Sequence, residues 1–141
     1  MAGISSFGAY IPKYRLGVES AGWESSFERS VANFDEDSVS MAVAAGIDCL
    51  SDRNRETIDG LLFATTTPPY AEKQCASIIA TALDLRRDIF TADITDVLRA
   101  GTTALKSALD SVTAGSATVS YTHLRAHETR HDLVCRLLLE K

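Results

Sequence analysis

The residues with the most suggestive chemistry are His127, Glu128 and His131, which form an H-E-x-x-H motif near the end of the chain. On a helix this spacing places two imidazoles one turn apart, with the glutamate beside them as a base, as in zinc peptidases. A zinc site needs a third ligand, and the first 122 residues contain no histidine. Beyond the motif only Asp132 and Glu140 carry carboxylates. The sequence therefore predicts no metal site.

The segment that carries the motif resembles a translated DNA-sequencing adapter. Residues 119–129, VSYTHLRAHET, resemble one reading frame of a transposase end used in library preparation, and residues 133–141, LVCRLLLEK, resemble the flow-cell primer that follows it. The gap between them has the size of an index. We therefore expect residues 118–141 to be a non-native tail and the natural sequence to stop near residue 117. As polypeptide, residues 118–122 could begin a strand and residues 123–141 could form a helix.

The composition is that of an ordinary globular domain. The 141 residues are 45% hydrophobic and 23% charged, with a net charge of −5, so nucleic acid is excluded as a partner. No apolar run is long enough to cross a membrane, and the N-terminus has no secretory pattern. The three cysteines, Cys49, Cys75 and Cys135, are widely spaced. This pattern favours a reducing cytoplasm over a disulfide scaffold.

Strand and helix patterns alternate along the chain and predict an α/β layered architecture. Strands are expected over 3–11, from Ile58 to residue 67, and over 88–95. Helices are expected over 33–52, 71–85 and 97–115, with a short additional helix over 18–27. Asn33 and Glu36 are spaced as a capping box for the first long helix, and Gly115 is placed to end the last one. Cys75 falls on the apolar stripe of the middle helix, which favours a buried structural thiol. The apolar side of the last helix is predicted to contain Leu98, Leu105, Leu109 and Val112.

Three segments together resemble the N-terminal part of 3-hydroxy-3-methylglutaryl-CoA synthases, most closely the archaeal type: GISSFGAYIPKYRL, RSVANFDEDSVSMAVAAGIDCL and TADITDVLRAGTTALKSALDSVTAG. The resemblance covers nearly all of residues 2–117. It implies a thiolase-like fold, in which two similar α/β halves pack as a five-layer sandwich, usually in a homodimer. This chain would supply the first part of the N-terminal half, a truncated αβα sandwich. It also implies acyl-CoA as the substrate and no resident cofactor.

The resemblance implies three catalytic groups: a cysteine at a helix N-terminus, a glutamate acid–base and a histidine in the second half. The helix N-terminus would lower the pKa of the cysteine thiol. In this sequence Leu98, in LRAGTTAL, occupies the cysteine position, and Thr66, in ATTTPPYAEK, occupies the glutamate position. Neither side chain can perform the family chemistry. We therefore assign no catalytic, cofactor-binding or metal-binding residue.

Other residues offer weak substitutes. Cys49 and Cys75 are expected in the middle of helices on apolar faces, where no dipole activates a thiol. Glu72 is expected to be a first-turn helix charge. Lys13 and Arg15 either meet the phosphates of CoA or form a solvated surface pair.

Three functions remain open. The parent protein either lacks catalysis and binds acyl-CoA or a thiolase-fold partner subunit, or it is an acyltransferase whose catalytic residues lie outside this chain. In the third alternative the chain as written is inactive, because a thiolase-type site is built between two halves. The parent is expected to be a cytoplasmic homodimer without nucleic-acid or membrane partners.

Overall fold

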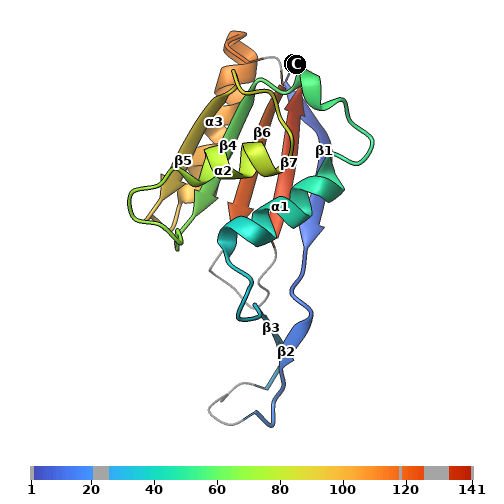
Figure 1. Cartoon of the computed structure of the whole chain (residues 1–141), viewed down its shortest axis with the longest axis vertical. Helices are drawn as coiled ribbons and strands as arrows, with labels where there is room; N and C mark the ends of the chain where they lie inside the picture. Colours follow the sequence, from blue (N-terminus) through green and yellow to red (C-terminus); the bar gives the residue numbers. More distant parts are fainter. Residues whose placement is uncertain (1, 21–25, 118, 126–133, 141) are drawn as a thin grey trace.

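A computed structural model describes residues 2–20, 26–117, 119–125 and 134–140. Figure 1 shows a mixed sheet with two helices on one face and one on the other, an αβα arrangement. The five-stranded sheet has the order β1-β7-β6-β4-β5, with a separate two-stranded sheet of β2 and β3. The strands are β1 Gly3–Tyr10, β2 Tyr14–Leu16, β3 Arg29–Val31, β4 Gly60–Thr65, β5 Phe90–Thr95, β6 Val119–Arg125 and β7 Val134–Glu140. The helices are α1 Ser38–Cys49, α2 Cys75–Ala82 and α3 Ala100–Ala114, with a 3₁₀ turn at Arg55–Thr57.

The central strand β4 explains the two-sided core. Its side chains alternate between the two faces of the sheet, and every residue of the strand is buried. Leu61 and Phe63 pack in a cluster with α1 and α2, whereas Leu62 and Ala64 pack against α3. The predicted α/β layering is confirmed, and β4 lies parallel to both β5 and β6.

The C-terminal segment corrects one prediction. A helix over 123–141 is wrong for the described residues, because β6 contains residues 123–125 and β7 lies antiparallel between β6 and β1. The motif residues His127, Glu128 and His131 lie outside the described part of the chain, as does Asp132. The described edge strands of the sheet are β1 and β5, and the C-terminal strands β6 and β7 lie between β1 and β4.

The start of α1 also differs from the prediction. Asp37 is the N-cap, and its Oδ1 accepts hydrogen bonds from the backbone N–H groups of Val39 (3.0 Å) and Ser40 (2.7 Å). The hydroxyl of Ser40 accepts a reciprocal bond from the Asp37 N–H at 2.8 Å. The expected pair does form a contact, in which the Asn33 N–H donates to Glu36 Oε2 at 2.8 Å, but it lies in the turn before the helix. Two overlapping capping patterns are present, and the later one begins the helix.

Helix α3 ends as predicted, with Gly115 in the left-handed conformation at φ 80°. Val112 is buried as predicted, but the rest of the buried face is made of alanines. Leu105 and Leu109 are only partly buried beside this face, and Leu98 lies outside the helix. Alanines let the helix approach the sheet closely. The buried residues of α3 are Ala100, Ala104, Ala108 and Val112.

The segment between β1 and α1 contains the β2–β3 pair, which extends away from the main sheet in Figure 1. The predicted helix over 18–27 is absent from residues 18–20 and 26–27, which form turns and bends. The remainder of that prediction, residues 21–25, lies outside the described part. In the portion of the chain that the structure describes, no helix combines the length and the apolar character needed to cross a bilayer.

Candidate functional site

The carboxyl ends of β4 and β5 form the edge where ligands bind in open α/β sheets. The two strands are in parallel register and finish together at Thr65 and Thr95. A cavity of about 1070 Å³ opens there. Its walls are residues 66–74, which connect β4 to α2, together with Ala92, Asp93, Thr95 and Asp96 from the end of β5. Helices α2 and α3 both begin at this edge, because each of them follows one of these parallel strands.

Thr66 is the first residue after β4 and lines this cavity. Its Oγ1 is buried and makes no hydrogen bond to the described residues. The position that the family resemblance assigns to a glutamate therefore does face the cavity. A threonine hydroxyl there can donate or accept a hydrogen bond, but it does not ionise near neutral pH and cannot move a proton as a carboxylate does.

Leu98 lies at the junction between β5 and α3. Arg99 is the N-cap of α3, so Leu98 immediately precedes the cap, and its side chain is 76% exposed. The chain turns sharply here: Asp96 has φ 64°, and the Ala100 N–H donates to the carbonyl of Val97 at 3.0 Å. A non-glycine residue at such a φ is strained, which is common where a strand passes into a helix at a functional site. The turn has the geometry to expose a reactive side chain, but the residue it exposes is a hydrocarbon.

The sequence predicts Cys75 in the middle of a helix, but α2 begins at this residue. The N-terminus is already occupied by the Asp93 carboxylate, which accepts hydrogen bonds from the N–H groups of Cys75 (2.6 Å) and Ala76 (2.7 Å). Burial raises the pKa of the Cys75 thiol, and the negative charges of Asp93 and Asp37 raise it further. The dipole of α2 is therefore directed at a carboxylate, and Cys75 remains a buried thiol.

Cys49 is also displaced from its expected mid-helix position, because it is the last residue of α1. Its thiol is 3.8 Å from the hydroxyl of Ser6, which donates to the Cys49 carbonyl at 2.9 Å. The C-terminus of a helix carries partial negative charge and disfavours a thiolate. The contact between Ser6 and Cys49 fastens β1 to α1.

Glu72 lines the cavity from the loop before α2, so its assignment to a first helical turn is wrong. Beside it, the ammonium group of Lys73 lies 5.1 Å from the ring centroid of Tyr70, a cation–π contact. Lys13 is exposed just before β2. Arg15, in β2, donates to the carbonyls of Pro12 and Tyr14, the latter at 3.0 Å.

Sequence reasoning missed Asp93, which links β5 to the N-terminus of α2. The available signal was a single carboxylate inside the strand FTADIT, since a charged residue in such a strand needs a partner. Among the described residues, no group of three metal-ligating side chains is gathered in one place.

Curated proteins related to this chain are hydroxymethylglutaryl-CoA synthases. The protein from Methanocaldococcus jannaschii is 33% identical over 129 residues, which cover 82% of this chain and 37% of the relative. Those from Thermococcus onnurineus and Pyrococcus furiosus are each 37% identical, over 126 and 123 residues, again covering 82% of this chain and 35% of each relative. The chain thus spans little more than a third of these relatives. No family model matches.

Solved structures share the fold. A 3-oxoacyl-(acyl carrier protein) synthase III from Pseudomonas aeruginosa matches with a TM-score of 0.82 at 20% identity, over 99% of this chain and 50% of that one. The corresponding synthase from Aquifex aeolicus gives 0.84 at 20% identity, over 100% and 54%. The HMG synthase of the curacin biosynthetic pathway gives 0.82 at 17% identity, over 99% and 40%. The partial thiolase-like α/β fold and the kinship with hydroxymethylglutaryl-CoA synthases, both expected from the sequence, are confirmed.

Proposed function

We propose that this chain is a portion of a thiolase-fold acyl-CoA-binding protein that does not itself transfer acyl groups. The premise is its homology to part of the hydroxymethylglutaryl-CoA synthases. The observation that carries the proposal is Leu98 at the turn before α3, where the side chain is exposed but has no nucleophilic atom. Thr66 in place of the acid–base carboxylate supports the same conclusion.

The missing step is transfer of an acyl group to a thiolate. In that step sulfur attacks the thioester carbonyl, the bond between the acyl carbon and the CoA sulfur breaks, and CoA leaves as a thiolate that takes up a proton. Replacing Leu98 with cysteine puts sulfur at the start of α3, where the unpaired N–H groups favour the thiolate. The parallel strands β4 and β5 and the tight turn at Asp96 supply the geometry for this test.

The experiment is intact-mass analysis of the full-length parent protein after incubation with acetyl-CoA, because a thiolase-type site is built between two halves. The wild type and the control Leu98→Ala are expected to remain unmodified, whereas Leu98→Cys should acquire a hydroxylamine-sensitive acetyl group. A covalent acetyl adduct on the wild-type chain would contradict the proposal. That result would favour the alternative, an acyltransferase whose catalytic residues lie outside this chain.

We extend the proposal to the organisation of the parent protein. Residues 1–117 form its related portion, and residues 118–141 are the adapter-derived tail. The curated relatives match 82% of the chain, which is nearly the share that residues 1–117 make up. Resequencing the gene from an unfragmented amplicon tests this: genuine genomic bases through codons 118–141 would refute the tail assignment.

The parent is further proposed to act as a cytoplasmic homodimer. An open edge on β5 supports self-association, because in the described sheet this strand pairs only with β4 and carries Phe90 at 65% exposure. Sedimentation of the full-length parent checks the state directly, and a single monomeric species across the micromolar range would reject the homodimer.

A further inference from the structure

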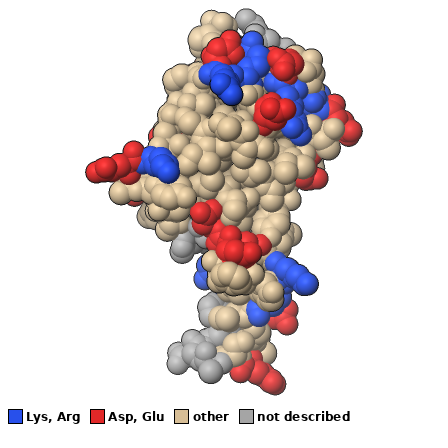
Figure 2. Space-filling view, viewed as in Figure 1, with Lys and Arg blue, Asp and Glu red and all other residues tan. Residues whose placement is uncertain are grey.

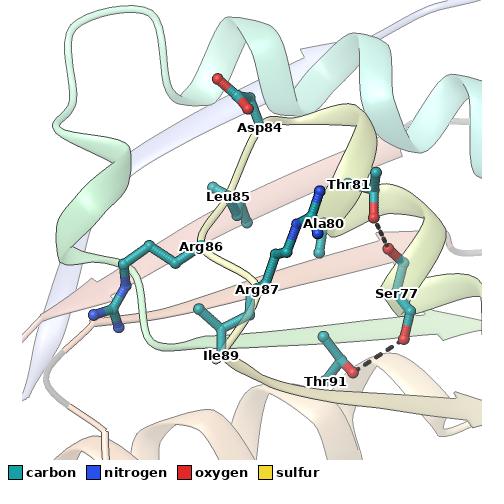
Figure 3. Close-up of a pocket in the computed structure, with 9 residues that line it drawn as sticks. All are labelled: Ser77, Ala80, Thr81, Asp84, Leu85, Arg86, Arg87, Ile89 and Thr91. Atoms are coloured by element: carbon teal, nitrogen blue, oxygen red, sulfur yellow. Dashed lines mark hydrogen bonds between the residues drawn. The ribbon is translucent and has the colours of Figure 1, made fainter.

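A second cavity lies on α2, at the end of the sheet away from the cavity beside Thr66. It has a volume of about 320 Å³ and is enclosed by α2, the connection that follows it and the start of β5 (Figure 3). It shares no lining residue with the cavity at the carboxyl edge. The two cavities are therefore separate, and the size of this one suits a small ligand.

One wall of this cavity offers hydrogen-bond acceptors. The hydroxyl oxygens of Ser77 and Thr91 lie 3.2 Å apart, and both hydroxyls also contact Gln74 Oε1. The orientation of the Gln74 amide is fixed, because its Nε2 donates to the Thr91 carbonyl at 2.9 Å. The Thr81 hydroxyl donates to the Ser77 carbonyl at 2.9 Å. Each hydroxyl has a single hydrogen, and each hydrogen has an acceptor within the wall. The oxygen lone pairs remain for a ligand that brings its own donors.

Opposite charges flank the same cavity. Arg87 is exposed, its side chain runs along the cavity toward Thr81 in Figure 3, and it has no ion-pair partner among the described residues. Asp84 lies at the end of α2 with φ 53°, held by hydrogen bonds from its own N–H to the Thr81 carbonyl (3.1 Å) and from the Leu85 N–H to the Ala80 carbonyl (3.0 Å). In Figure 3 the Asp84 carboxylate points away from the hydroxyls of Ser77 and Thr91, so Arg87 is the charge that runs along the cavity.

We propose that this cavity binds a small zwitterion of the aliphatic α-amino acid class. The ligand carboxylate pairs with Arg87, its ammonium group donates to the hydroxyl oxygens of Ser77 and Thr91, and its side chain packs on the apolar floor. The floor is formed by Ala80, Leu85 and Ile89. A phosphate lacks an ammonium group that could donate to these hydroxyl oxygens. Figure 2 shows acidic side chains among the basic ones at the end of the molecule reached by the connection after α2, so no uniform positive field attracts a polyanion.

The test is titration of the isotopically labelled 141-residue chain with L-leucine, followed by amide NMR shifts. Saturable shifts are expected across residues 77–91. The dissociation constant should be about 1 mM, because only one ion pair holds the ligand in an open cavity. Arg87→Gln should weaken binding about tenfold or more, because it removes a charge-assisted hydrogen bond. Arg99→Gln is the matched control, since Arg99 lies at the N-cap of α3 and does not line this cavity.

Three further probes separate the chemistries. Isovalerate carries the carboxylate alone, isoamylamine carries the ammonium alone, and inorganic phosphate carries only oxygens. Each is expected to bind about tenfold more weakly than leucine or not at all. A second variant, Ser77→Ala, removes one hydroxyl acceptor and should weaken leucine binding while leaving isovalerate binding unchanged. The proposal is overturned if phosphate or isovalerate binds as tightly as leucine, if Arg87→Gln keeps wild-type affinity with a dispersed spectrum, or if leucine near its solubility limit shifts none of these amides.

Discussion

Replacing Gly8 with alanine should separate β1 from α1. A Cβ built at Gly8 would lie 2.5 Å from the backbone N of Cys49 and 2.6 Å from the carbonyl oxygen of Ala45, whereas ordinary contact begins near 3.4 Å. Both neighbours are backbone atoms at the C-terminal end of α1, so no side-chain rotation relieves the overlap. The strand and the helix must therefore move apart by nearly 1 Å.

The magnitude follows from three contributions. Overpacking of this kind costs about 1–3 kcal/mol. The separation also strains the hydrogen bond from Ser6 Oγ to the Cys49 carbonyl, 2.9 Å long, which contributes about 1 kcal/mol. Against these, alanine reduces the entropy of the unfolded chain and stabilises by about 0.4–1 kcal/mol. The net expectation for Gly8→Ala is a loss of about 1–3 kcal/mol in the free energy of unfolding.

Urea unfolding followed by circular dichroism measures this loss as a lower midpoint, by about 1 M for a chain of this size. Gly3→Ala is the control, since it lies on the same strand and its added Cβ meets nothing within 4 Å. It should change stability by less than about 0.5 kcal/mol. Equal midpoints for the two variants would refute the close contact between β1 and α1.

Three other predictions follow from single contacts. Asp93→Ala leaves the N–H groups of Cys75 and Ala76 without their acceptor and should cost about 2 kcal/mol in urea unfolding; an unchanged midpoint would refute the bridge. The buried Cys75 thiol, whose pKa is raised, should be alkylated by iodoacetamide at pH 8 at least about tenfold more slowly than a free small-molecule thiol, and site-resolved mass spectrometry showing equal rates would contradict this. The pKa of Glu36 is lowered below its unfolded value, chiefly by the hydrogen bond from the Tyr10 hydroxyl and secondly by the one from the Asn33 backbone N–H. This contribution to stability is therefore present above the unfolded pKa and is lost as pH falls through the folded pKa. Tyr10→Phe should therefore flatten the acid side of the stability profile between about pH 5 and pH 3, and a slope equal to that of the wild type would count against it.

Local signals were sufficient for several elements. The run from Ile58 predicted β4 because a strand buried on both faces needs apolar side chains at successive positions. Gly115 predicted the end of α3 because a left-handed cap favours a residue without Cβ. Helix starts were less predictable. Two capping patterns overlap before α1, and only packing of Val39 and its neighbours on the sheet selects the one at Asp37.

Non-local partners account for the remaining differences. A helix was expected over 123–141, but the described residues of this segment form strands. They pair with β1 at the other end of the chain and with β4 in its middle. Similarly, α2 begins at Cys75 because the Asp93 carboxylate, eighteen residues later, accepts its N–H. Neither contact leaves a short-range pattern in the sequence.

The sequence by itself determined which chemistry is missing, because side-chain identity is local: Leu98 has no nucleophilic atom and Thr66 no carboxylate, whatever the fold. It also supplied the family kinship that gives those two positions their meaning. Tertiary structure alone decided that Asp93 occupies the N-terminus beside Cys75, and that Arg87 and the Thr91 hydroxyl line one cavity. Such juxtapositions depend on how a helix packs against a strand, and packing of that kind joins residues through space rather than through sequence spacing.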